Sequence, residues 1–159
     1  MSVLMTGANI SYPPVFDDRR AAVARKLAKF GRLCEVGIGE RHGVAAALAS
    51  DGCAVTGTDV VDRDPPDCIE FVRDDVVAAA ERAAGDGGPG PHYRVDCVYA
   101  LNCPPELHRP LVRVAAGVDA ACAFTTLGGD PPAVDVTPLA LSDGDTLYVA
   151  RDPEGVLID

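Results

Sequence analysis

The feature that most constrains the fold is a regular alternation of short apolar runs with segments of helical character. The apolar runs are Leu33–Val36, 54–58, 69–72, 95–101 and 120–126. The segments between them predict helices at 44–49, at 76–84 and from Pro104-Pro105 to about Ala116. Strands that are apolar along their whole length are buried on both faces, and helices supply their crossovers. The sequence therefore predicts an α/β fold with a doubly wound, mostly parallel Rossmann-like sheet.

The two ends of the chain extend this pattern. A further helix is expected from Asp17, which can cap it, to Gly31, which can stop it. Residues 1–16 contain Pro13-Pro14 and are expected to be a loosely held lead-in, so that residues 17–159 form a single domain. Two more strands are expected at 133–139 and 146–150, joined by a turn at 142–145. They predict a C-terminal strand pair.

The charge balance restricts where the protein works and what it binds. The chain of 159 residues has 24 acidic and 14 basic side chains, a net charge of −10, and only two lysines, Lys26 and Lys29. Such an acidic, lysine-poor surface is typical of halophilic proteins, because salt screens the repulsion between carboxylates. An ordinary acidic cytosolic protein is the alternative. A general affinity for nucleic-acid phosphates is not expected without a basic surface.

Neither membrane insertion nor secretion is expected from the sequence. No apolar run approaches the roughly 18 residues that cross a bilayer, and the first residues lack a basic stretch before an apolar one. The six cysteines form no C-x-x-C pair, which argues against a structural zinc site or a thioredoxin-type motif. Four of the six lie in or beside apolar strand-like runs and are expected to be buried free thiols in a reducing compartment. A cytoplasmic protein without a metal site is predicted.

A candidate ligand site follows from the residues at the carboxyl ends of the predicted strands, where doubly wound folds bind ligands. Gly37 and Gly39 occupy the first strand-to-helix turn, after Glu35, and glycine lets the backbone approach a ligand closely. Asp59 ends the second strand and can accept two hydrogen bonds from ribose hydroxyls. Asp75 follows the third strand, where an adenine amino group could donate to it. A nucleoside-type ligand is expected.

This arrangement resembles the class I S-adenosylmethionine-dependent methyltransferases. Their first motif, an acid followed by glycines at alternate positions, is matched by Glu35, Gly37 and Gly39. Their usual third glycine falls at Arg41, a departure that would narrow the methionine end of the pocket. The resemblance implies S-adenosylmethionine as cofactor, with Glu35 holding the loop or the methionine amino group.

The chain is more closely similar to uncharacterised protein family 0146, a small archaeal group with a methyltransferase-like Rossmann fold. The matching stretches are 35–39, 58–59, 71–75, 99–101, 104–107 and 124–130. This resemblance implies the fold and nucleoside binding, and it implies no established reaction. The methyl acceptor is therefore not indicated.

Two other functions remain open on the same residues. The first is an NAD-dependent oxidoreductase, since Gly37 and Gly39 also begin a G-x-G-x-x-G motif. However, its third position is His42, and Glu40 would face the pyrophosphate. A sulfonium ion suits an acidic site better. The second is a non-catalytic Rossmann-like module that acts through a protein partner, and a partner or a homodimer could also complete the site.

Catalytic candidates are few. Asn102 ends the fourth strand, where amino-group methylases carry Asn-Pro-Pro-aromatic, but Cys103 separates it from the prolines and Glu106 replaces the aromatic residue. Asp130 lies in a loop rich in glycine and proline and is a candidate substrate contact. Cys103 could act as a nucleophile with His108 one helical turn on. For all three, a purely structural role is the competing interpretation.

Overall fold

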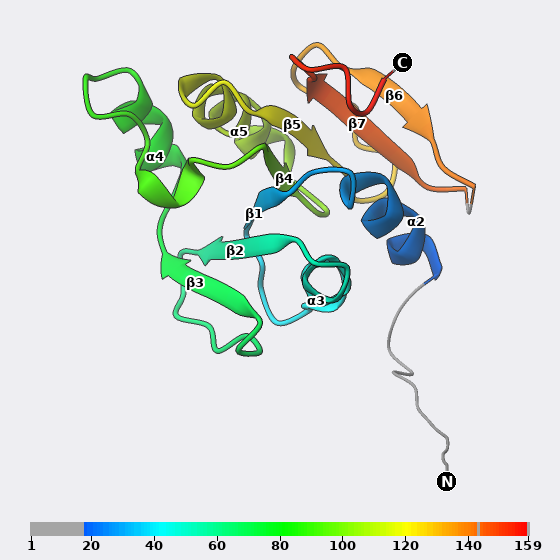
Figure 1. Ribbon diagram of the computed structural model, residues 1–159. Helices are drawn as coiled ribbons and strands as arrows, with labels where there is room; N and C mark the ends of the chain where they lie inside the picture. The colour runs from blue at the N-terminus through cyan, green and yellow to red at the C-terminus, as the bar shows by residue number, and fades with distance from the viewer. Residues whose placement is uncertain (1–17, 143, 159) are drawn as a thin grey trace, which may run out of the picture.

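A computed structural model of the chain describes residues 18–142 and 144–158 (Figure 1). These residues form a seven-stranded sheet in the order β3-β2-β1-β4-β5-β7-β6. The strands are β1 (Arg32–Val36), β2 (Ala54–Asp59), β3 (Ile69–Arg73), β4 (Cys97–Ala100), β5 (Ala121–Phe124), β6 (Thr137–Ala140) and β7 (Thr146–Arg151). Strands β1 to β5 pair in parallel, whereas β7 is antiparallel to both β5 and β6. The predicted α/β fold and its mostly parallel sheet are confirmed.

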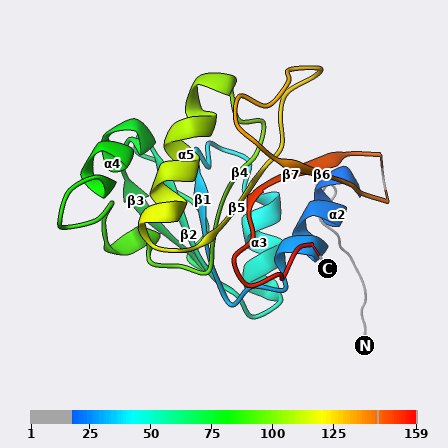
Figure 2. The ribbon, with the colours of Figure 1, turned by 90° about the horizontal axis from the view of Figure 1, so that it is seen from above.

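The helices cover both faces of the sheet (Figure 2). Among the described residues they are α2 (Asp18–Leu27), α3 (Gly43–Ser50), α4 (Val76–Ala83) and α5 (Pro105–Gly117), together with the 3₁₀ turn η2 (Pro91–Tyr93). Helices α2 and α3 pack on one face through buried residues such as Leu27 and Leu48. Helices α4 and α5 pack on the other through Ala79, Leu111 and Val114. The predicted lead-in, 1–16, and the capping residue Asp17 lie outside the described residues.

The C-terminal strand pair is present, but its first strand begins at Thr137 and not near residue 133. The residues before it pack sideways onto the core under α5, since Val134 and Val136 contact that cluster. In addition, the Ala133 amide donates to the His108 ring and so cannot pair in the sheet. The apolar run at 133–136 is therefore a packed connection and not a strand, because its backbone is hydrogen-bonded to the buried His108.

The parallel strands bring five segments to one end of the sheet, and this end is called the carboxyl rim. It consists of the residues that follow β1 to β5: 37–42, 60–68, 74–75, 101–104 and 125–136. All predicted site residues lie on the rim or at the strand ends beside it. In the part of the chain that the structure describes, no helix has the length and apolarity to cross a membrane.

Candidate functional site

The turn after β1 is fastened to the end of β2. The amides of Gly37 and Ile38 both donate to the Thr58 carbonyl at 2.9 Å, and the Gly39 amide donates to Asp59 Oδ2 at 2.8 Å. Gly37 and Gly39 have φ of 70° and 60°, which a side chain would strain. The structure thus brings Gly37, Gly39 and Asp59 together, as the sequence predicted.

A third glycine, which sequence reasoning missed, makes this turn fit. Gly57 lies within β2, and a Cβ atom there would stand 2.6 Å from Cδ1 of Ile38. Ile38 is only 3% exposed, so its side chain needs the space that Gly57 leaves. The sequence signal is a glycine inside an apolar strand, which often marks a close approach of another segment.

The carboxylate of Asp59 accepts three hydrogen bonds from its surroundings. Its Oδ2 accepts from the Gly39 amide and from Arg63 Nε at 3.3 Å, and its Oδ1 accepts from the Val61 amide at 3.2 Å. Burial by itself raises the pKa of Asp59, but the hydrogen bonds from Val61 and Gly39 and the charge of Arg63 hold it below its usual value. Asp59 is therefore ionised at neutral pH.

Glu35 is the second-last residue of β1, and its side chain is buried. It is 2% exposed, and the Tyr99 hydroxyl on β4 donates to its Oε1 at 2.7 Å. Burial raises the pKa of Glu35 to about 8, against the opposing effects of the Tyr99 hydrogen bond and the charge of Arg20. Nη1 of Arg20 is itself buried and has no hydrogen-bond partner among the described residues. Tyr99 and Arg20 were not predicted from the sequence.

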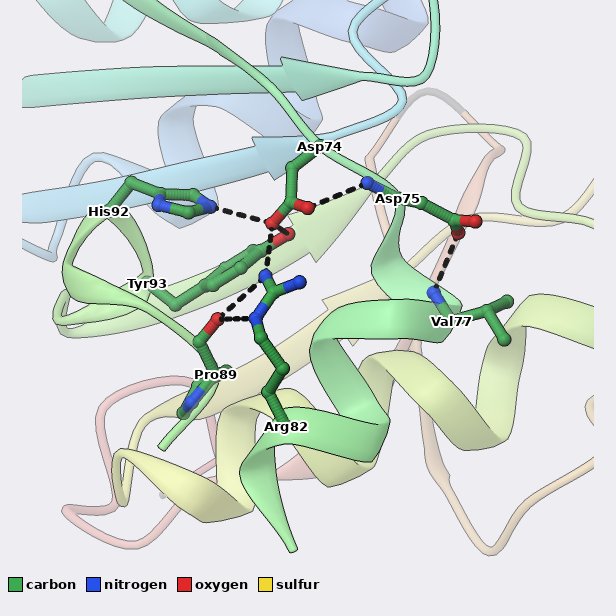
Figure 3. A network of polar contacts seen from close by, with 7 residues as sticks. All are labelled: Asp74, Asp75, Val77, Arg82, Pro89, His92 and Tyr93. Carbon is green, nitrogen blue, oxygen red and sulfur yellow. Dashed lines mark hydrogen bonds and ion pairs between the residues drawn. The ribbon is translucent and has the colours of Figure 1, made fainter. Parts of the chain in front are cut away.

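Two consecutive aspartates after β3 have different roles (Figure 3). Asp75 caps α4, where its Oδ1 accepts from the Val77 amide at 2.9 Å, and its exposed carboxylate points away from Asp74. Oδ2 of Asp74 accepts from Arg82 at 2.7 Å, His92 at 2.8 Å and Tyr93 at 2.9 Å. Asp74 thus ties the segment after α4 to the sheet, whereas Asp75 stays accessible at the rim.

The ends of β4 and β5 are joined to each other. The Asn102 amide donates to Thr125 Oγ1 at 2.8 Å, and the Cys103 amide donates to the Thr125 carbonyl at 2.8 Å. Asn102 has a φ of 49°, uncommon outside glycine, and its side chain is exposed at the rim. The Cys103 thiol is buried, and burial raises its pKa to about 12, which favours a packing role over a nucleophilic one.

His108 connects this region to the β5–β6 connection. It is fully buried, and its ring stacks on Phe124 with centroids 4.1 Å apart. Its Nδ1 accepts from the Ala133 amide at 3.0 Å, which leaves Nε2 to donate to the Cys103 carbonyl at 2.9 Å. The described contacts do not link Asp130, which is exposed in the same connection, to any other predicted site residue.

Exposed apolar side chains lie on the rim segments and in the first turn of α4. Val60 and Val61 follow Asp59 directly and are 57% and 50% exposed, and Val77 in the first turn of α4 is 41% exposed. Leu127, after β5, is 67% exposed. Large exposed apolar residues beside an ionised carboxylate, as Val60 and Val61 are beside Asp59, are typical of a binding surface for a partly apolar ligand.

Two surface cavities lie away from the predicted site residues. One of about 780 Å³ is at the amino ends of the strands, between Phe30, Asp96 and Pro153, and one of about 540 Å³ lies between Arg109 of α5 and Val134. Neither is lined by a predicted site residue. Within residues 18–142 and 144–158, no group of three or more histidine, cysteine or acidic side chains could hold a metal ion. The rim remains the site on which the predicted chemistry converges.

Several of the solved structures with a similar fold are methyltransferases. The bifunctional kinase-methyltransferase WbdD matches with a TM-score of 0.56 and 14% identity over 84% of this chain, although the chain spans only 39% of WbdD. The methyltransferase domain of bacterial CtHen1 matches with a TM-score of 0.51 and 13% identity, over 82% of this chain and 97% of that domain. These likenesses show a methyltransferase-like fold.

Relatives of closer sequence are archaeal. A UPF0146 protein of Halobacterium salinarum is 50% identical over 130 residues, covering 82% of this chain and 95% of its own length. A UPF0146 protein of Archaeoglobus fulgidus is 36% identical over 100 residues, covering 63% of this chain and 71% of its own. The family model for UPF0146, an uncharacterised protein family, matches residues 18–152. The chain therefore belongs to the UPF0146 family.

Proposed function

We propose that the chain binds S-adenosylmethionine at the carboxyl rim beside β1, β2 and β3 and transfers its methyl group. The observation that carries the proposal is the fastening of the Gly37–Gly39 turn to Asp59. It presents an accessible backbone and an ionised carboxylate at the same point, as binding of a ribose beside a glycine turn requires. The methyltransferase-like fold supports the choice of this cofactor among nucleosides.

The charged groups around the glycine turn fit the ligand. Its ammonium group would pair with Glu35, and its carboxylate would satisfy the buried, unpartnered Nη1 of Arg20. Its ribose hydroxyls would donate to Asp59, and its adenine would lie near Asp75 between apolar side chains such as Val61. Because the ligand's sulfonium is positive and it carries no phosphate, an acidic rim favours it over a dinucleotide.

Bound S-adenosylmethionine would supply an activated methyl group, so the chain's own residues need mainly to position an acceptor. Asn102 is the strongest candidate for this role. Its left-handed backbone turns an exposed amide out at the end of β4, and such strain is often found at functional sites. The amide would orient an acceptor amine, and Asp130 would contact the acceptor from the β5–β6 connection.

A second function, in which the rim serves a partner protein or a second copy of the chain, has one observation in its favour. Leu127 is 67% exposed, two residues after Thr125, whose Oγ1 accepts from the Asn102 amide. Burial of such a side chain by a partner would be favourable. In that case the partner completes the acceptor site, or the chain is a non-catalytic module that acts through the partner.

Isothermal titration calorimetry tests the proposal. S-adenosylhomocysteine is titrated in molar potassium chloride into the wild-type protein, Asp59→Ala and a matched control, Asp62→Ala, whose carboxylate is 79% exposed on the same connection. Binding by the wild type and the control but not by Asp59→Ala, with all three folded by circular dichroism, supports the site. Equal affinity in Asp59→Ala contradicts it. Normal folding without nucleoside binding in any protein favours the partner function.

A further inference from the structure

We propose that Arg63 is a specificity-determining residue. In the free protein it occupies the carboxylate of Asp59 that would bind the ribose, and it thereby weakens the preference of the site for a ribose over a deoxyribose. The inference rests on the proposed nucleoside function, and it adds a property that the function does not require. It concerns the side chain that spans two rim segments, the β2–β3 connection and the turn after β1.

Arg63 bridges these segments through two nitrogens of its guanidinium group. Its Nε donates to Asp59 Oδ2 at 3.3 Å, and its Nη1 lies 3.5 Å from Glu40 Oε2. The side chain of Asp59 is 10% exposed and that of Arg63 is 25% exposed, whereas Glu40 is 87% exposed. The contact with Asp59 is thus the more sheltered one, and the contact with Glu40 is open to screening by salt.

The hydrogen-bonding capacity of Asp59 shows what this contact costs a ligand. A carboxylate offers about four acceptor sites. Three are in use, since the Gly39 amide and Arg63 occupy Oδ2 and the Val61 amide occupies Oδ1. One site is left, so only one ligand hydroxyl can bind while Arg63 stays in place.

A ribose has two neighbouring hydroxyls, and a 2′-deoxyribose has one of them. To accept both hydroxyls, Asp59 must lose one of its three present donors. The amides of Gly39 and Val61 belong to the backbone and are fixed, so the donor that leaves is the Arg63 side chain. A deoxyribose needs only the free site and leaves Arg63 where it is. Competition with Arg63 therefore lowers the affinity for ribonucleosides and leaves that for deoxyribonucleosides nearly unchanged.

The test uses adenosine and 2′-deoxyadenosine, which are uncharged, so that loss of the arginine charge does not by itself change their affinity. Dissociation constants are measured by NMR titration in molar potassium chloride for the wild type and Arg63→Ala. The matched control is Arg73→Ala, because the Arg73 side chain contacts the Val60 carbonyl and Asp62 on the same connection. Arg73 pairs with Asp59 through the backbone of β2 and β3, and none of its described side-chain contacts is with the Asp59 carboxylate. Glu40→Gln is a second variant, which removes only the ion pair between Arg63 Nη1 and Glu40.

For Arg63→Ala we expect adenosine to bind about three- to tenfold more tightly, while 2′-deoxyadenosine changes by less than about twofold. Glu40→Gln should give a smaller change of the same sign, and Arg73→Ala none. A merely structural role of Arg63 would weaken both ligands equally. Weaker binding of adenosine to Arg63→Ala, or an unchanged ratio of the two constants in both Arg63→Ala and Glu40→Gln, overturns the inference.

Failure of the inference is separable from failure of the proposed function. If the wild type binds S-adenosylhomocysteine and Arg63→Ala leaves the ribose preference unchanged, the function stands and the role of Arg63 is wrong. If neither protein binds S-adenosylhomocysteine or adenosine, the nucleoside site itself is wrong, and the inference is rejected with it.

Discussion

Glu35 and Tyr99 are register partners in the neighbouring parallel strands β1 and β4, and the Tyr99 hydroxyl donates a 2.7 Å hydrogen bond to Glu35 inside the core. The pair places an acidic group beneath the glycine turn with almost no access to solvent. An ionised carboxylate there loses its hydration, so the free protein favours the protonated form. A cationic ligand would reverse that preference.

The first prediction concerns the pH dependence of stability. The pKa of Glu35 is raised from 4.5 to about 8, so between these values the unfolded chain is ionised while the folded protein keeps the proton. The free energy of unfolding therefore falls as pH rises from 4.5 to 8, by a few kcal/mol. Glu35→Gln keeps an acceptor for Tyr99 and removes this loss.

Urea denaturation at pH 6 and pH 9 measures the effect. The stability advantage of Glu35→Gln over the wild type should be larger at pH 9 by a few kcal/mol. Glu70→Gln, an exposed residue of β3, is the matched control and should show no such change. An advantage that is equal at both pH values would show that Glu35 titrates normally.

A second prediction concerns the close approach between β2 and the glycine turn. In Gly57→Ala the new Cβ atom would stand 2.6 Å from Ile38, so we expect a loss of about 1–3 kcal/mol in the free energy of unfolding. Ile38→Ala, added to Gly57→Ala, should cost less than it does alone, because it relieves the clash. Gly87→Ala is the control, since its Cβ atom would meet nothing within 4 Å. Wild-type stability of Gly57→Ala would refute the packing described here.

The third prediction concerns Asp74, whose carboxylate holds Arg82, His92 and Tyr93. Burial by itself raises the pKa of Asp74, but hydrogen bonds from His92, Arg82 and Tyr93 lower it below its usual value. Its contribution to stability is therefore present above the usual pKa of an aspartate and is lost as pH falls through the lower folded value. At pH 7, Asp74→Asn should cost about 2–4 kcal/mol.

Chemical denaturation of Asp74→Asn is compared with Asp86→Asn, an exposed aspartate of the segment that the network anchors. The deficit of Asp74→Asn should shrink as the pH is lowered toward 3, while Asp86→Asn stays close to the wild type throughout. A deficit that is absent at pH 7 would mean that the network does not anchor this segment.

The arrangement of elements followed from the sequence because it depends on local patterns. Apolar runs bounded by glycine, proline or aspartate gave the strands close to their observed limits, as for 54–58 against Ala54–Asp59. The run at 133–136 was wrongly predicted as a strand, because its conformation depends on a hydrogen bond from the Ala133 amide to His108, 25 residues away in the sequence. Long-range hydrogen bonds of this kind leave no periodic signal.

The candidate site was predictable in its glycines and in Asp59, whose spacing reflects one strand–helix–strand unit. Its surroundings were not. Tyr99 meets Glu35 only through the register of β1 and β4, 64 residues apart in the sequence. Arg63 reaches Asp59 from a connection whose path no motif describes. Such residues become visible only when side chains are placed in space.

A thermal-shift panel in molar potassium chloride tests whether the chain binds S-adenosylmethionine. S-adenosylmethionine, S-adenosylhomocysteine, NAD and ATP are compared at equal concentrations. A ligand at about 100 times its Kd adds about 2.7 kcal/mol, which raises the Tm of a chain of this length by about 5–10 °C. S-adenosylmethionine and S-adenosylhomocysteine should each give such a rise, and NAD and ATP should give none. No rise with either of the first two at millimolar concentration, or a larger rise with NAD, would contradict the proposed function.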